Sequence, residues 1–221
     1  MFDKLKNLSE HISQAKNAIT FDASRFNDPL AEQIQWTALE SGGSNFKTHK
    51  LIEVSPSRME FQPTLGSKLF GLLFIASGVI IPIVFILTSF QSQDPEMTRM
   101  SLFSILFGAV FVGVGYLTYR KFSIPIVFDK VNGRFWKGKT DNDQPNADKE
   151  GAMKLSDVYA VQLISQYVKR DKKSYYIYEL NFVMGDTKRY NMIRHGGKRQ
   201  IRRDAEKLSG FLGIPLWDAA G

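Results

Sequence analysis

The chain has 221 residues, a net charge of +7 and no cysteine. This length predicts one or two domains, and a composition of 43% hydrophobic and 23% charged residues excludes bulk disorder and collagen-like repeats. Without cysteine, disulfides, thiolate nucleophiles and cysteine-bound zinc are excluded. Two uncharged runs, 69–93 and 100–119, are each long enough to cross a bilayer core of roughly 30 Å. We therefore expect an integral membrane protein.

Residues 1–45 are expected to form an N-terminal helical segment. Apolar residues recur every three or four positions between Phe2 and Ile19, as on one face of an amphipathic helix. That face either packs on its own domain or lies on a membrane surface. Asp28 and Pro29 are typical of a helix start, and the apolar spacing extends this second helix past Ala38 to the Ser-Gly-Gly-Ser sequence at 41–44.

Residues 46–65 predict two short strands, 46–54 and 58–61, around a Ser-Pro-Ser turn. These strands either form a small section of their own or join the sheet predicted later in the chain. In the second case the intervening membrane segment is an insertion within one domain.

Residues 66–121 predict a transmembrane hairpin with spans at 69–90 and 100–119. Basic residues flank the hairpin on both sides, whereas its short loop offers Arg99 alone. The positive-inside rule then places both termini in the cytoplasm, which predicts a multi-pass protein of the bacterial cytoplasmic (inner) membrane.

Each span carries two glycines seven residues apart, namely Gly71 and Gly78 in the first and Gly108 and Gly115 in the second. Small residues at this spacing line one stripe of a helix and let two backbones approach closely. The stripes either pack against each other within the hairpin or form the seam of a dimer.

Residues 122–221 predict an antiparallel β-meander closed by a C-terminal amphipathic helix. Strands are expected at 124–128, 134–137, 158–168, 175–184 and 188–194, with an Asn-Gly corner after the first. In the fourth, Leu180 and Phe182 alternate with Glu179 and Asn181, which predicts a half-buried sheet. The helix ends at Gly213. The expected fold class is α+β, integral to the membrane.

This layout resembles a family of uncharacterised bacterial two-span membrane proteins with a pleckstrin-homology-like (PH-like) domain. The resemblance rests on the hairpin, on Phe128-Asp129 followed by Gly133, and on the sequence AEKLSGFLGIPLWD at 205–218. The layout is also similar to the photosystem I assembly factor of chloroplasts and cyanobacteria, and the likeness covers roughly 66–218. It implies a PH-like cytoplasmic domain and, by analogy, a scaffold or assembly role. It assigns no functional residues.

Clustered basic residues are the best lead to a binding surface. They flank the second span, crowd the turn after the third strand and line the last helix: Arg120, Lys121, Lys169, Arg170, Lys172, Lys173, Arg199, Arg202 and Arg203. Such residues bind anionic lipid headgroups or an acidic protein partner, or they simply form a solvated surface. We expect a non-enzymatic membrane-anchored scaffold or accessory protein without cofactor or metal, bound to a protein partner or to its own copy but not to nucleic acid.

The alternative function is a nucleotide-binding enzyme. Residues 133–140 (GRFWKGKT) match the P-loop pattern, in which a glycine-rich turn before a helix cradles phosphates. Phe135 and Trp136 fit a strand better than such a cradle, and the acidic Asp141-Asn142-Asp143 sequence follows. His195 lacks a carboxylate at a recognisable spacing, so it is expected to be an ordinary residue at the end of a strand.

Overall fold

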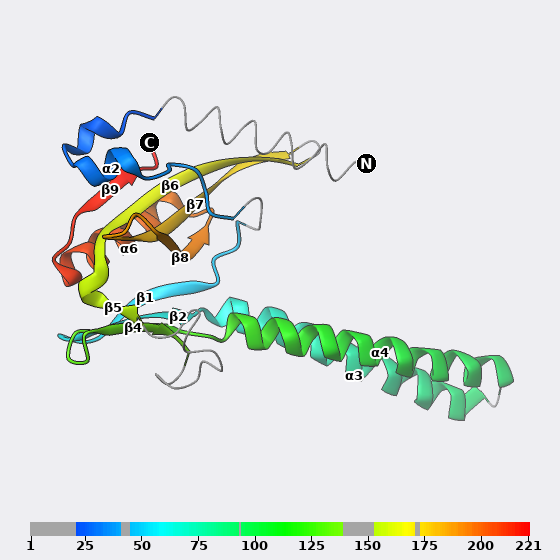
Figure 1. The fold of residues 1–221 in the computed structure, drawn as a ribbon. Coiled ribbons are helices and arrows are strands. Elements are labelled where there is room, and N and C mark those ends of the chain that lie inside the picture. Colours follow the sequence, from blue (N-terminus) through cyan, green and yellow to red (C-terminus); the bar gives the residue numbers. More distant parts are fainter. Residues whose placement is uncertain (1–20, 41–44, 93, 139–152, 171–172) are drawn as a thin grey trace. The chain divides into compact units, whose positions relative to one another are not determined.

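The computed structural model describes residues 21–40, 45–92, 94–138, 153–170 and 173–221 (Figure 1). The chain divides into two compact units. One is formed by residues up to 61 together with 126–221, and the other by Gln62–Pro125. The predicted amphipathic helix at 2–19 lies outside the described residues.

The second unit is a hairpin of two long helices, α3 (Leu65–Ser92) and α4 (Pro95–Phe122), each of 28 residues (Figure 1). At 1.5 Å per residue each helix is about 42 Å long. Both are long and apolar enough to cross a membrane, and most of their large apolar side chains are exposed. Asp94 caps α4 by accepting the Glu96 amide at 2.9 Å. Both predicted spans lie within these helices.

The glycines of the two predicted stripes, Gly71, Gly78, Gly108 and Gly115, are buried and face each other across the seam of the hairpin. A Cβ on Gly78 would lie 2.6 Å from the backbone oxygen of Gly108, and a Cβ on Gly115 would lie 2.8 Å from the Ile75 nitrogen. A Cβ on Gly108 would overlap the Gly78 oxygen. The glycine stripes therefore pack within the hairpin, and the alternative of a dimer seam built on them is wrong.

Replacing Gly108 with Ala should destabilise the hairpin, because the new methyl group meets backbone that cannot move aside. We expect a loss of about 1–3 kcal/mol, the usual cost of overpacking. SDS titration of the purified protein in mixed micelles measures it. Gly113→Ala is the matched control on the same helix, because no atom lies within 4 Å of its Cβ position. Equal stability of the two variants would contradict the glycine seam.

The first unit contains a five-stranded sheet in the order β1-β2-β3-β4-β5. Its strands are β1 (His49–Ser55), β2 (Arg58–Pro63), β3 (Ile126–Asp129), β4 (Arg134–Lys137) and β5 (Met153–Lys154). β2 pairs antiparallel with β3, with Arg58 opposite Asp129 and Phe61 opposite Ile126. The early strands thus belong to the same sheet as strands that follow the hairpin, and the hairpin is an insertion between neighbouring strands.

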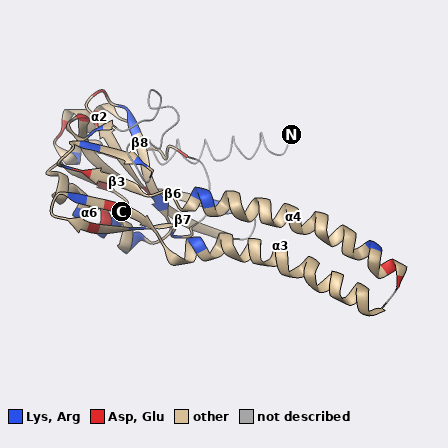
Figure 2. Ribbon diagram, turned by 90° about the horizontal axis from the view of Figure 1, so that it is seen from below, with Lys and Arg blue, Asp and Glu red and all other residues tan. Residues whose placement is uncertain are grey.

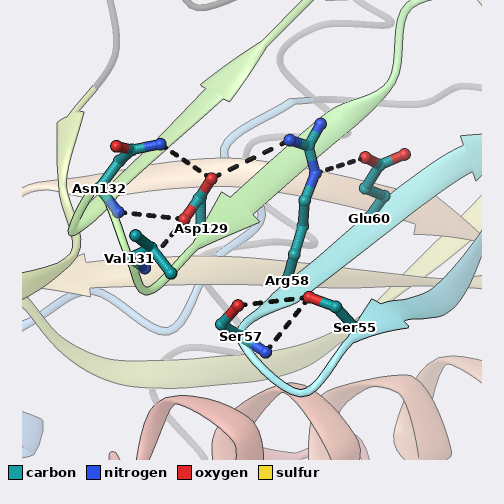
Figure 3. A network of polar contacts seen from close by, with 7 residues as sticks. All are labelled: Ser55, Ser57, Arg58, Glu60, Asp129, Val131 and Asn132. Atoms are coloured by element: carbon teal, nitrogen blue, oxygen red, sulfur yellow. Dashed lines mark hydrogen bonds and ion pairs between the residues drawn. The ribbon is translucent and has the colours of Figure 1, made fainter.

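Asp129 organises the turn between β3 and β4 (Figure 3). Its Oδ1 accepts the amides of Val131 and Asn132 at 2.9 and 3.0 Å, and its Oδ2 accepts the Asn132 side-chain amide at 3.0 Å. Gly133 then adopts φ +60°, a backbone conformation that side chains disfavour. The turn thus explains physically the Phe-Asp-x-x-x-Gly pattern in the sequence.

A second sheet follows in the order β8-β7-β6-β9. Its strands are β6 (Val158–Arg170), β7 (Lys173–Met184), β8 (Arg189–His195) and β9 (Leu216–Ala219). The predicted single meander is therefore two sheets. β9, which the sequence analysis did not predict, runs parallel to β6, with Val161 opposite Leu216.

The helix α6 (Lys198–Leu212) closes the unit as predicted and ends at Gly213, whose φ is +72°. Its apolar face packs into a core that both sheets share. Phe182 of β7 lies at the centre of this core, with its ring 5.4 Å from that of Phe128 and 5.0 Å from that of Phe135.

The N-terminal part of the first unit departs from prediction. A short 3-10 helix, η1 (Ala23–Phe26), precedes α2 (Pro29–Gln33), and Asp28 caps α2 by accepting the Leu30 amide. The predicted second helix should continue past Ala38, but it ends at Gln33 because Ile34 is extended, with ψ 161°. The residues beyond it form hydrogen bonds to the second sheet instead of to a helix.

Candidate functional site

The basic residues singled out in the sequence fall into three places. Arg120 and Lys121 are exposed in the last turn of α4. Lys169 is exposed near the end of β6, whereas Lys172 and the side chains of Arg170 and Lys173 lie outside the description. The three arginines Arg199, Arg202 and Arg203 share α6.

Basic residues lie on α6 (Figure 2), and its arginines have different contacts. Arg202 is held by Asp218 of β9, with 2.5 Å between Nε and Oδ2, and this bond raises the pKa of Arg202. It therefore ties the helix to the last strand. Arg199 and Arg203 are exposed, with Arg203 donating to the Gln200 side chain at 3.0 Å. These two, with the exposed Lys207, form the basic face of α6.

The second sheet has a polar face on the side opposite α6, and this face is buried on β6 and β7 and half-buried on β8. The predicted half-buried sheet is wrong here, because Glu179 and Asn181 are 1% and 0% exposed. Asn181 donates to Glu179 at 2.9 Å and to Gln162 at 3.3 Å, and Asn191 donates to Asn181 at 3.1 Å. The face comprises Gln162, Gln166, Glu179, Asn181, Arg189, Asn191 and Arg194.

An irregular segment, residues 35–40, which bends at Thr37, Leu39 and Glu40, covers this face, and we call it the strap. Gln162 donates to the Gln35 carbonyl at 3.1 Å and Arg189 to the Thr37 carbonyl at 2.8 Å. The Leu39 amide donates to Glu179 Oε1 at 2.9 Å. The polar face therefore bonds the strap backbone at every second residue.

Charge at the polar face is only partly compensated. Arg194 forms an ion pair with Glu40 of the strap at 3.0 Å and also donates to Gln166. Burial lowers the pKa of Arg189, while the nearby Glu179 carboxylate acts to raise it. Within the described ranges, Glu179 Oε2 is buried without a hydrogen-bond partner. A buried carboxylate oxygen in this state is costly.

An aromatic cluster anchors the strap at its start. Trp36 stacks on Phe26 with ring centroids 5.1 Å apart and lies 6.2 Å from Trp217 of β9. Its Nε1 donates to the Ala31 carbonyl at 2.9 Å. The strap is thus fixed by apolar contacts at its start and by polar contacts along its length.

A cavity of about 410 Å³ lies at the far end of the strap. Its walls include Leu39 and Glu40 of the strap, Arg189 and Asn191 of the polar face, and Lys137 of β4. Lys137 donates to the Asn191 carbonyl at 3.0 Å. A second cavity of about 540 Å³ lies between the β5–β6 connection and the β7–β8 turn.

The P-loop alternative gains no support from the local structure. Residues 134–137 form strand β4, in which Phe135 and Trp136 are buried, so the middle of the segment is not a cradle. Lys139 and Thr140 lie outside the described residues. In the part of the chain that the structure describes, no cluster of three or more His, Asp or Glu could hold a metal ion.

His195 at the end of β8 is 1% exposed and packs beside α6. Its Nδ1 accepts the Gly197 amide at 3.0 Å, which leaves the proton on Nε2, and that atom is buried without a described partner. Burial, reinforced by the charge of Lys47, lowers the pKa of His195 to about 4. Asp204 of α6 is also buried, and burial raises its pKa.

Sequence reasoning missed the residues of the polar face. Their alternation with apolar residues is the ordinary sign of a solvent-facing side. Glu179 and Arg194 stand opposite each other in the sheet register, but nothing local to them shows that the strap covers them. Comparison of the chain with protein-family models, curated proteins and solved structures finds no match.

Acid should destabilise the protein through His195. Its folded-state pKa lies below the unfolded value near 6.5, so its contribution to stability is complete above that value and is lost as the pH falls toward 4. We expect a loss of about 2 kcal/mol between about pH 7.5 and pH 5. Urea unfolding at both pH values measures it.

His195→Asn can still accept the Gly197 amide, and it should remove most of this acid loss. Asp204→Asn is the control. The raised pKa of Asp204 acts in the opposite sense, so this variant should keep the loss. An unchanged pH dependence in His195→Asn would contradict the assignment.

Proposed function

We propose that this protein is a non-enzymatic, membrane-anchored scaffold or accessory protein of the bacterial cytoplasmic membrane. The observation that carries the proposal is the apolar hairpin inserted between β2 and β3. Its helices bury little besides their glycine seam and expose large side chains such as Leu73, Phe90 and Leu106. An apolar surface of this extent requires a lipid or protein environment.

The strand pairing supports a topology in which both ends of the hairpin lie on the same side of the membrane. β2 precedes the hairpin and β3 follows it, yet the two strands are hydrogen-bonded neighbours. Segments paired in one sheet cannot lie on opposite sides of a bilayer, so the hairpin enters and leaves from one side. Arg120 and Lys121 in the last turn of α4 favour the cytoplasmic side.

The two-sheet unit supplies the binding surfaces of the proposed scaffold. Arg199, Arg203 and Lys207 give α6 an exposed basic face, suited to anionic lipid headgroups or to carboxylates of a protein partner. Each cation near an anionic leaflet contributes about 1 kcal/mol, so a tethered domain needs few of them to dock.

Cysteine labelling tests the topology without background, because the chain contains no cysteine. We expect Gln91→Cys, at the far end of the hairpin, to react with a membrane-impermeant maleimide in intact bacterial cells. Lys50→Cys, on β1, should react only after the cells are permeabilised. Labelling of both positions in intact cells, or of neither, would contradict a spanning hairpin, and the reverse pattern would contradict the orientation.

Charge reversal on α6 tests the binding surface. Arg199→Glu with Arg203→Glu should remove most of a stoichiometric crosslink to a membrane-complex partner or to anionic lipid, read by mass spectrometry of the tagged protein. Lys50→Glu with Lys154→Glu is the matched control, since both lysines are exposed on the other sheet. Equal crosslinking by the two double variants would show that the basic face of α6 is solvated surface.

A further inference from the structure

The second sheet has two buried faces of opposite chemistry. Tyr178, Leu180 and Phe182 of β7 point into the apolar core beneath α6, whereas Glu179 and Asn181 between them point to the strap. Buried polar networks rarely stabilise a protein more than apolar packing of the same volume would. The polar face therefore needs an explanation other than stability.

The contacts of the polar face are those of a site that binds a peptide through its backbone. Gln162, Arg189 and Glu179 bond backbone groups of residues 35, 37 and 39, which any sequence provides. The ion pair between Arg194 and Glu40 adds a side-chain contact. Recognition thus depends on backbone groups at every second residue and on a carboxylate at one position.

Release of the strap would expose a surface that water can solvate. The amides, guanidinium groups and carboxylate of the polar face all form hydrogen bonds with water, whereas an apolar face would become an exposed patch. Glu179 Oε2, which has no described partner now, would gain one from solvent. Leu39 is already 41% exposed, so its side chain holds the strap only weakly.

Space and charge at the end of the strap favour a longer, acidic ligand. The cavity of about 410 Å³ begins at Leu39 and Glu40, so a bound segment could continue into it. Arg189 and Lys137 line this cavity, and Arg194 lies at the position of the Glu40 carboxylate.

We propose that the polar face is the binding site for an acidic peptide segment of a protein partner, held through its backbone, and that the strap is its intramolecular occupant. A carboxylate of the partner takes the position of Glu40, and the partner backbone replaces that of residues 37–40. The aromatic cluster around Trp36 stays in place and keeps the displaced strap close. This inference deepens the proposed scaffold function, because it names the kind of partner.

A single backbone amide offers a direct test in the full-length protein in detergent micelles. Leu39→Pro removes the amide that Glu179 accepts, and Leu39→Ala keeps it. The probe is a labelled peptide with the strap sequence Thr-Ala-Leu-Glu of residues 37–40, read by fluorescence anisotropy. We expect Leu39→Pro to bind it about fivefold more tightly than wild type, as loss of one hydrogen bond predicts, and Leu39→Ala to match wild type.

Hydrogen exchange shows whether Leu39→Pro remains folded, because β7 should stay protected while residues 35–40 exchange faster. If β7 loses protection, Glu40→Lys replaces it as the test variant, with Glu53→Lys on β1 as control. Glu40→Lys should bind the probe about threefold more tightly than wild type, since a partly exposed ion pair is lost. No gain in probe binding by a folded, strap-released variant overturns the proposal.

Two further outcomes decide the chemistry of the partner. A probe ending in Gln should bind several-fold more weakly, and equal binding overturns the acidic requirement. A doubled mass of the Leu39→Pro protein in native mass spectrometry would show straps exchanged between two copies, which overturns a separate partner. Because binding is read in micelles, a negative result leaves the membrane topology intact, and a failure of the cysteine labelling leaves the peptide site intact.

Discussion

β2 and β3 are hydrogen-bonded neighbours, although the entire helical hairpin lies between them in the chain. Arg58 faces Asp129 at one end of this pairing, and Phe61 faces Ile126 at the other. Phe61 and Phe128 contribute rings 5.8 Å apart to the core that the two sheets share. The hairpin is therefore an insertion, because the first sheet is built from strands that precede it and strands that follow it in the chain. The strand before the hairpin and the strand after it are paired with each other in one register.

The two sides of the second sheet carry different side chains, because only one of them faces the shared core. Toward the core, β7 offers large apolar residues, and α6 covers them with Ile201, Ala205 and Leu208. Arg202 then connects α6 to β9 through Asp218. On the other side, the same strand offers polar groups that the strap covers through its backbone. One strand thus joins an apolar contact on one side of the sheet to a polar contact with a backbone segment on the other.

The glycine spacing in the hairpin predicted a packing stripe on each helix but not the partner of that stripe. The spacing identified a stripe on each helix, and the structure confirms that the stripes pack closely. The spacing alone left open whether the partner of each stripe was the neighbouring helix or a second copy. The close approach of Gly78 to Gly108 within one chain decides for the neighbouring helix. The same helices expose their remaining apolar surface, which fits the proposed position in a membrane.

The sequence by itself determined the elements that depend on near neighbours. Two uncharged runs predict long helices, the Asn132-Gly133 corner predicts the β3–β4 turn, and Gly213 ends α6, because each of these signals acts over a few residues. Only the tertiary structure decided that α2 stops at Gln33, that β9 adds in parallel, and that Glu179 is buried. These outcomes depend on segments distant in the chain: Leu39 reaches Glu179, and Trp36 reaches Trp217. Periodicity reports which side of a strand is polar, but the segment that covers that side is set by packing.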